Sequence, residues 1–167
     1  AGPTEYVVPT VTWPSAECTT KVDDLIKQMS NAQKAAQMVM GQNPNTGTVT
    51  STGLGTVFCG GTLTPPGGSK ASDWAGMIDG YIAAAAASSL KIPLLYGIDA
   101  VHGASKTVGS VLFPHNAGLG SSRDPQLVED IGRVTAIEAA AQGMSWTFAP
   151  SLSVSFDDRW GRVFESF

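Results

Sequence analysis

Hydrophobic residues recur at helical spacing in three stretches of this chain. In each stretch, apolar side chains fall three or four positions apart, which places them on one face of a helix. The first stretch starts at Lys21, the second at about Ser72 and the third at Asp124. The apolar positions are Val22, Leu25, Ile26 and Met29 in the first; Trp74, Met77, Ile78, Tyr81, Ile82 and Ala85 in the second; and Leu127, Val128, Ile131 and Val134 in the third.

Capping residues mark where several of these helices begin and end. Ser30 followed by Gln33 three positions later forms a capping box, which predicts a second helical start inside the first stretch. Ser72 is the expected cap of the second stretch. In the third, a cap at Asp124 with proline at the next position is typical of a helix start, and Gly143 is a fitting stop.

Short apolar runs between these helices predict three strands, at residues 55–61, 92–99 and 144–154. The segment 41–53 is rich in Gly, Asn and Thr and is expected to be a loop. Helices alternating with continuously apolar strands are typical of an α/β fold with a parallel sheet. A flavodoxin-like α/β domain is the alternative at this point, because pattern alone does not give strand order.

Composition narrows the class of protein. A length of 167 residues corresponds to about one domain, and a net charge of −4 with no basic run argues against a nucleic-acid surface. No apolar stretch approaches the length of a membrane span. Residues 1–20 contain three prolines without periodicity and are expected to form an extended N-terminal arm. Cys18 and Cys59 are compatible with either two free thiols or one disulfide.

Polar and charged residues gather after the ends of the second and third predicted strands, although Asp, Glu, Lys and Arg make up only 14% of the chain. Asp99 and His102 follow the second strand, and a segment dense in acids and arginines closes the chain at 157–167. Because the carboxyl ends of parallel strands form the functional edge of α/β folds, we expect a site there. The alternatives are a capping role for Asp99, a structural role for His102 and His115, and a solvated turn at the end.

Several kinds of chemistry lack their usual motifs. The chain has no dinucleotide-binding or phosphate-binding glycine loop, no H-x-x-x-H or C-x-x-C spacing, and no G-x-S-x-G element. We therefore expect neither a cofactor nor a metal. Arginine and tryptophan near the end, at Arg159, Arg162 and Trp160, are instead suited to binding polyhydroxylated rings.

Three motifs in order, IPLLYGIDAVHG, LFPHNAGLGSSRDPQLV and GMSWTFAPSLSVSFDDRWGRVFES, resemble the N-terminal part of glycoside hydrolase family 3. The resemblance covers nearly everything from Lys21 to Phe167 and is greatest to β-glucosidases and exo-acting β-glucan glucohydrolases. It implies a (β/α)₈ TIM-type barrel followed by a second domain. Residues 21–167 would then be the N-terminal portion of the barrel, about three βα units, with the rest of the barrel and the second domain outside this sequence.

The same resemblance implies roles for individual residues. Asp99 and Arg162 are expected to bind hydroxyl groups of the sugar in the −1 pocket, and Glu165, Arg159 and His102 are less certain contacts. Asp99 and Glu165 could be mistaken for the catalytic pair. In the family, the nucleophile and the acid/base come from later segments, so both are expected beyond residue 167 and this chain alone is expected to be inactive.

The implied activity is that of a retaining glycosidase, which releases glucose from the non-reducing ends of β-glucans or β-glucosides. The expected partners are that substrate and the remainder of the same polypeptide, and the expected location is extracellular or periplasmic. Alternatives within the family are a β-xylosidase or a β-N-acetylglucosaminidase. An alternative of another class is a non-catalytic carbohydrate-binding fragment.

Overall fold

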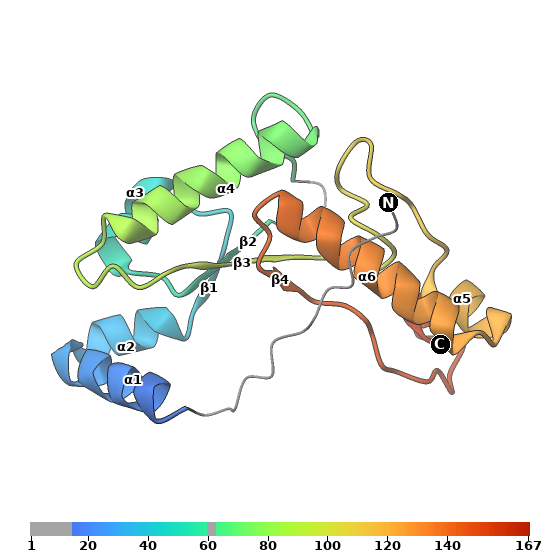
Figure 1. Ribbon diagram of the computed structural model, residues 1–167, viewed down its shortest axis with the longest axis horizontal. Coiled ribbons are helices and arrows are strands. Elements are labelled where there is room, and N and C mark those ends of the chain that lie inside the picture. Colours follow the sequence, from blue (N-terminus) through green and yellow to red (C-terminus); the bar gives the residue numbers. More distant parts are fainter. Residues whose placement is uncertain (1–14, 60–62) are drawn as a thin grey trace.

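The protein is described by a computed structural model that covers residues 15–59 and 63–167 (Figure 1). Helices and short strands alternate along the chain, as the hydrophobic pattern predicts. The elements are α1 (Ala16–Gln28), α2 (Asn31–Gln37), β1 (Met40–Gln42), α3 (Thr46–Thr52), β2 (Thr56–Phe58), α4 (Ala71–Ala86), β3 (Leu95–Ile98), α5 (Asn116–Ser122), α6 (Pro125–Ala141), β4 (Trp146–Thr147) and the 3₁₀ helix η1 (Val163–Glu165).

The four strands form one parallel sheet in the order β1-β2-β3-β4. Strands that follow one another in the chain are therefore neighbours in the sheet. A flavodoxin-like sheet has the order 2-1-3-4-5, so that alternative is wrong. The sheet has one strand more than the three predicted, because β1 is only three residues long and residues 41 and 42 of it fall in the segment 41–53 whose composition indicated a loop.

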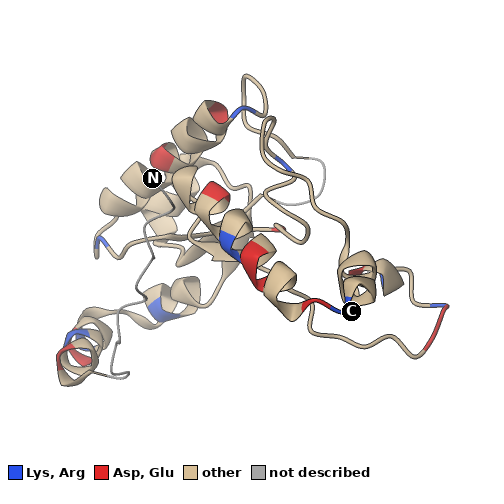
Figure 2. Ribbon diagram, turned by 45° about the vertical axis from the view of Figure 1, so that its right-hand side comes forward, with Lys and Arg blue, Asp and Glu red and all other residues tan. Residues whose placement is uncertain are grey.

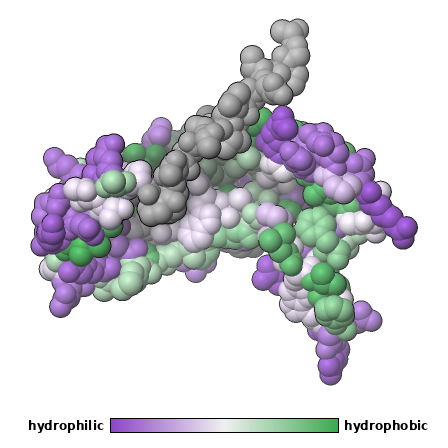
Figure 3. All heavy atoms as spheres, turned by 60° about the horizontal axis from the view of Figure 1, so that its bottom comes forward, coloured by the Kyte–Doolittle hydropathy of each residue, from purple (hydrophilic) through white to green (hydrophobic). Residues whose placement is uncertain are grey.

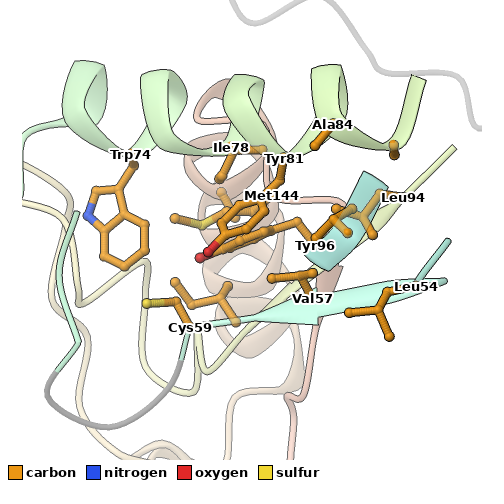
Figure 4. Packing of buried hydrophobic residues seen from close by; sticks show 14 of the residues in the cluster. Leu54, Val57, Cys59, Trp74, Ile78, Tyr81, Ala84, Leu94, Tyr96 and Met144 are labelled. Carbon is orange, nitrogen blue, oxygen red and sulfur yellow. The ribbon is translucent and has the colours of Figure 1, made fainter. Parts of the chain in front are cut away.

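The largest buried side chains lie between the sheet and α4 (Figure 4). Trp74, Ile78 and Tyr81 project from α4 toward Val57 of β2 and Tyr96 of β3. Apart from Tyr81, which is 5% exposed, these residues are at most 1% exposed. The indole nitrogen of Trp74 also donates a hydrogen bond of 3.3 Å to the Lys106 carbonyl, which ties α4 to the loop after β3.

The opposite face of the sheet carries a second group of aromatic side chains around Gly97. The rings of Phe58 and Trp146 pack edge-on against Phe148, with centroid distances of 5.9 and 5.0 Å respectively. A Cβ atom at position 97 would lie 2.6 Å from the Phe148 ring. A side chain in the middle of β3 would therefore require the Phe148 ring to move from its present position on the sheet.

Local signals placed several helix boundaries correctly. The capping box at Ser30 is present in both directions, and the side chain of Asp124 caps α6, whose first residue is Pro125. The first helix begins at Ala16 with Ser15 as its cap, five residues earlier than predicted, so the arm predicted for 1–20 is wrong for 16–20. The rest of that predicted arm, residues 1–14, lies outside the described part of the chain.

Other boundaries differ because side-chain contacts decide them. Lys70, and not Ser72, is the N-cap of α4, since the carboxylate of Asp73 accepts a hydrogen bond from the Lys70 amide at 3.0 Å. Helix α3 lies in the segment 41–53, which composition assigned to a loop, and α5 lies in the long connection between the second predicted strand and the third predicted helix. The predicted strand 144–154 is regular only at Trp146–Thr147, after which the chain leaves the sheet.

Cys18 and Cys59 are both free thiols. The structure therefore has two free thiols and not the alternative disulfide. Cys59 lies in the core beside Tyr96, and burial raises the pKa of its thiol. No helix within residues 15–59 and 63–167 is long and apolar enough to span a membrane.

The packing of α4 leads to a stability prediction. Ile78→Ala is expected to lower the free energy of unfolding by about 2–5 kcal/mol, because it removes a fully buried side chain and leaves a cavity. Ile82→Ala, one turn along the same helix, removes an identical group that is 48% exposed and is expected to cost about 1 kcal/mol or less. Urea denaturation of both variants measures the difference. Equal losses would contradict the packing described for α4.

Candidate functional site

Asp99 lies at the carboxyl end of β3, where the chain leaves the sheet. Parallel pairing of β3 with β4 directs both strand ends toward the same edge. The loop after β3 and the segment after β4, residues 148–167, therefore begin side by side. We call residues 148–167 the closing segment. The two segments carry the residues that the sequence singled out. Asp99 itself is partly buried.

The loop after β3 is held in a fixed shape around His102. Its ring nitrogen Nδ1 lies 2.9 Å from the Phe113 carbonyl oxygen, and the Phe113 amide donates to the His102 carbonyl at 3.0 Å. A carbonyl can only accept, so Nδ1 carries the proton. Gly103 has φ +94°, and a Cβ atom there would lie 2.1 Å from the Val111 carbonyl oxygen, so only glycine fits this turn.

Arg162 and Glu165 form a bidentate ion pair. Arg162 is the N-cap of η1 and Glu165 is its last residue. Nε of Arg162 donates to one carboxylate oxygen of Glu165 at 2.8 Å, and Nη2 donates to the other at 2.5 Å. The Glu165 side chain is only 11% exposed, whereas that of Arg162 is 63% exposed. The carboxylate thus lies inside the protein and presents the guanidinium at the surface.

The charges of this pair stabilise each other. The hydrogen bonds from Arg162 lower the pKa of Glu165; burial acts in the opposite direction, and the positive charges of Arg162 and His115 add to the lowering. Glu165 in turn raises the pKa of Arg162, with a smaller contribution from the charge of Asp99. Arg162 and His115 therefore act on Glu165, and Asp99 acts on Arg162.

Two histidines connect the loop after β3 to η1. The rings of His102 and His115 lie 4.0 Å apart between centroids, and His115 packs edge-on against Phe164 at 4.8 Å. This stack brings together residues from the loop, from the start of α5 and from the closing segment. His115, which the sequence suggested to be structural, is the middle ring of the stack.

Arg159 is placed differently from the other predicted site residues. It pairs with Asp157 two residues earlier, through contacts of 2.6–3.1 Å, and its side chain is 90% exposed. Acidic and basic residues lie side by side at the outer end of this loop (Figure 2). The structure therefore brings Asp99, Arg162, Glu165 and His102 toward one edge and places the Arg159 ion pair on an exposed turn.

Sequence reasoning missed one residue at this edge. Asn116 is 4% exposed, and its side-chain amide donates to the Glu165 carbonyl oxygen at 2.6 Å. The only signal for it in the sequence is a polar amide after the apolar residues of LFPH. In the described part of the chain, no group of three or more His, Cys, Asp or Glu residues could hold a metal ion.

Many large hydrophobic side chains are exposed in the described part of the chain. Figure 3 shows a face on which hydrophobic surface lies between two hydrophilic ends. In the segment after β4, apolar residues alternate with serines and are strongly exposed: Leu152 at 85%, Val154 at 65% and Phe156 at 96%. Such an alternation leaves one apolar side of an extended segment uncovered next to the site.

Comparison with known proteins finds relatives that match nearly the whole chain. The family model described as the glycosyl hydrolase family 3 N terminal domain matches residues 20–167. A lysosomal beta glucosidase of Dictyostelium discoideum is 33% identical over 167 aligned residues, which cover 89% of this chain and 20% of that protein. A periplasmic beta-glucosidase of Salmonella typhimurium is 49% identical over 82 residues, covering 49% of this chain and 10% of the relative.

Among solved structures, an exo-1,3/1,4-beta-glucanase from a Pseudoalteromonas species matches with a TM-score of 0.84 and 38% sequence identity. The match covers 91% of this chain and 20% of that protein. The chain thus spans about a fifth of the length of the Dictyostelium and Pseudoalteromonas relatives. The predicted fold class, an α/β unit of TIM-barrel type, is confirmed.

The ion pair leads to a prediction for the titration of Glu165. Arg162→Gln is expected to raise the pKa of the Glu165 carboxyl, because it removes the hydrogen bonds and the charge that contribute most to lowering it, and leaves burial opposed only by the charge of His115. Carboxyl ¹³C chemical shifts recorded against pH measure this change. Arg159→Gln is the matched control, since it removes a guanidinium of the neighbouring ion pair and should leave Glu165 unaffected.

The sign of the accompanying stability change follows from the direction of the shift. A carboxyl with a lowered pKa in the folded protein stabilises it at pH values above its unfolded-state pKa, and this contribution is lost as the pH falls through the folded-state value. Arg162→Gln should therefore reduce the acid-dependent part of the unfolding free energy. An unchanged Glu165 titration in Arg162→Gln would contradict the ion pair.

Proposed function

Because the chain belongs to glycosyl hydrolase family 3, we propose that the protein containing it is a retaining glycosidase that releases glucose from the non-reducing ends of β-glucans or β-glucosides. The names of its relatives, two beta-glucosidases and an exo-1,3/1,4-beta-glucanase, support this activity and substrate class. The relative named as periplasmic supports a location outside the cytoplasm, either periplasmic or extracellular.

The observation that carries the proposal is the exposed guanidinium of Arg162 beside Asp99. Arginine has five N–H donors, and Glu165 accepts from two of its nitrogens. Within the described residues this guanidinium donates no other hydrogen bond, so its remaining N–H groups are available to sugar hydroxyls. Asp99, at the strand end nearby, supplies carboxylate acceptors. Together they form a donor and acceptor pair suited to a polyhydroxylated ring.

Glu165 is unsuited to either catalytic role of a retaining glycosidase. A nucleophile must reach the anomeric carbon, whereas the Glu165 side chain is only 11% exposed and is held by Arg162 through both carboxylate oxygens. A general acid needs a raised pKa, and the pKa of Glu165 is lowered. This supports assigning the nucleophile and the acid/base to segments beyond residue 167, with Asp99 and Arg162 binding the sugar in the −1 pocket.

The proposal includes further strands from the same polypeptide. In the described sheet, β1 and β4 each pair with a neighbour on one side only. Parallel sheets of βα units are normally closed or covered, and the (β/α)₈ barrel closes such a sheet with eight strands. Residues 21–167 would then supply the N-terminal portion of the barrel and part of the sugar pocket.

The test is made in the whole polypeptide with aryl β-glucoside as substrate. Asp99→Asn and Arg162→Ala are each expected to lower kcat/KM by about 10- to 100-fold, because each removes charge-assisted hydrogen bonds to the sugar that strengthen in the transition state. Asp130→Asn and Arg133→Ala, charge-matched changes at exposed positions of α6, should leave kcat/KM near the wild-type value. Aryl xyloside and N-acetylglucosaminide are tested beside the glucoside.

Two outcomes would contradict the proposal. Wild-type kinetics in both site variants would remove Asp99 and Arg162 from the sugar pocket. A higher kcat/KM on the xyloside or the N-acetylglucosaminide would replace glucose as the released sugar while leaving the family assignment intact.

A further inference from the structure

Asn116 is a buried polar residue that joins three separate segments of the chain. It occupies the first turn of α5, and its amide nitrogen lies 2.6 Å from the Glu165 carbonyl oxygen and 3.4 Å from that of Ser151. Glu165 is 49 positions away in sequence and Ser151 is 35. The side chain thus bridges the start and the end of the closing segment from one point on α5.

Serine hydroxyls continue this bridge. Ser151 and Ser153 are linked at 3.0 Å, and Ser153 is linked to Ser166 at the same distance. Ser166 is 3% exposed and directly follows Glu165. Asn116 and the three serines therefore hold the start of the closing segment, at Ser151 and Ser153, next to its end at Glu165 and Ser166.

This bridge fixes the main chain from which the Arg162–Glu165 pair projects. Asn116 holds the backbone oxygen of Glu165, and Glu165 holds the guanidinium of Arg162 through both carboxylate oxygens. His115, next to Asn116, packs on Phe164, next to Glu165. A chain of contacts thus leads from α5, through η1, to the guanidinium.

We propose that Asn116 is a positioning residue that sets the orientation of Arg162 for sugar binding. This inference rests on the proposed function, because it assumes that Arg162 contacts the sugar. Asn116 does not itself contact the ligand. Its effect on catalysis passes through η1 and the Glu165 carboxylate, and loss of its hydrogen bond lets the guanidinium leave the orientation that it holds here.

A double-mutant cycle in the whole polypeptide tests this, with kcat/KM on aryl β-glucoside measured for wild type, Asn116→Ala, Arg162→Ala and the double variant. Asn116→Ala alone is expected to lower kcat/KM by about 10-fold, because a small misplacement of a group that positions the substrate weakens its contacts in the transition state. In the Arg162→Ala background, the same change should lower it by less than about 2-fold, since the group being oriented is gone.

Two further variants separate positioning from general destabilisation. Asn116→Leu keeps most of the side-chain volume without the donor and should behave like Asn116→Ala. Gln142→Ala removes another buried amide, at the C-cap of α6, which accepts from the Thr107 hydroxyl in the loop after β3 and donates to the Glu138 carbonyl. Whatever its effect on kcat/KM, that effect should be the same with and without Arg162.

The outcomes are distinct. Equal effects of Asn116→Ala in both backgrounds would overturn the inference and leave the proposed function intact, provided that Arg162→Ala itself lowers kcat/KM. Wild-type kcat/KM in Asn116→Leu would also overturn the inference, because it would show that filling the space is sufficient. Wild-type kcat/KM in Arg162→Ala would overturn both the inference and the role of Arg162.

Discussion

Parallel pairing of β3 with β2 on one side and β4 on the other is the constraint on which the rest of the structure depends. It turns the ends of β3 and β4 toward one edge, so that Asp99 and the closing segment meet there. On one face of the sheet, the ring of Phe148 occupies the space that a side chain at position 97 would fill. On the other face, the same strands present Val57 and Tyr96 to α4.

The fold was predictable where local chemistry decides it. Helix α6 begins where Asp124 and Pro125 indicate, and the box at Ser30 forms as its sequence suggests, because caps act within a single turn. Helix α3 was missed because threonine and glycine are poor helix formers. It is stabilised by an Asn45 cap and by burial of Val49, and tertiary contacts of that kind override propensity.

For the site as well, features set by local sequence were predictable and features set by contacts between distant residues were not. Asp99 and Arg162 stand in motifs that resemble a known family, and their charges lie close enough to affect each other. The pairing of Arg159 with Asp157 away from that edge depends on the shape of an exposed turn, which no motif encodes. Asn116 could not have been found from local patterns, because its partners lie 35 and 49 positions away.

At this edge the negative charge of the ion pair is buried and the positive charge is exposed. Glu165 supplies a buried negative charge that is fully paired, and Arg162 carries the complementary charge to the surface. A buried carboxylate without such a partner would be costly, whereas a paired one fixes an arginine whose remaining donors face outward. Sugar recognition would then depend on a guanidinium whose orientation is set before the ligand arrives.

The most direct measurement is a crystal structure of the whole polypeptide with glucose bound in the sugar pocket. We expect the Asp99 carboxylate and the Arg162 guanidinium to lie within about 2.7–3.2 Å of sugar hydroxyl oxygens, with Arg162 still paired to Glu165. Glucose bound without contact to either residue, or an Arg162 that leaves Glu165 to reach the sugar, would contradict this expectation.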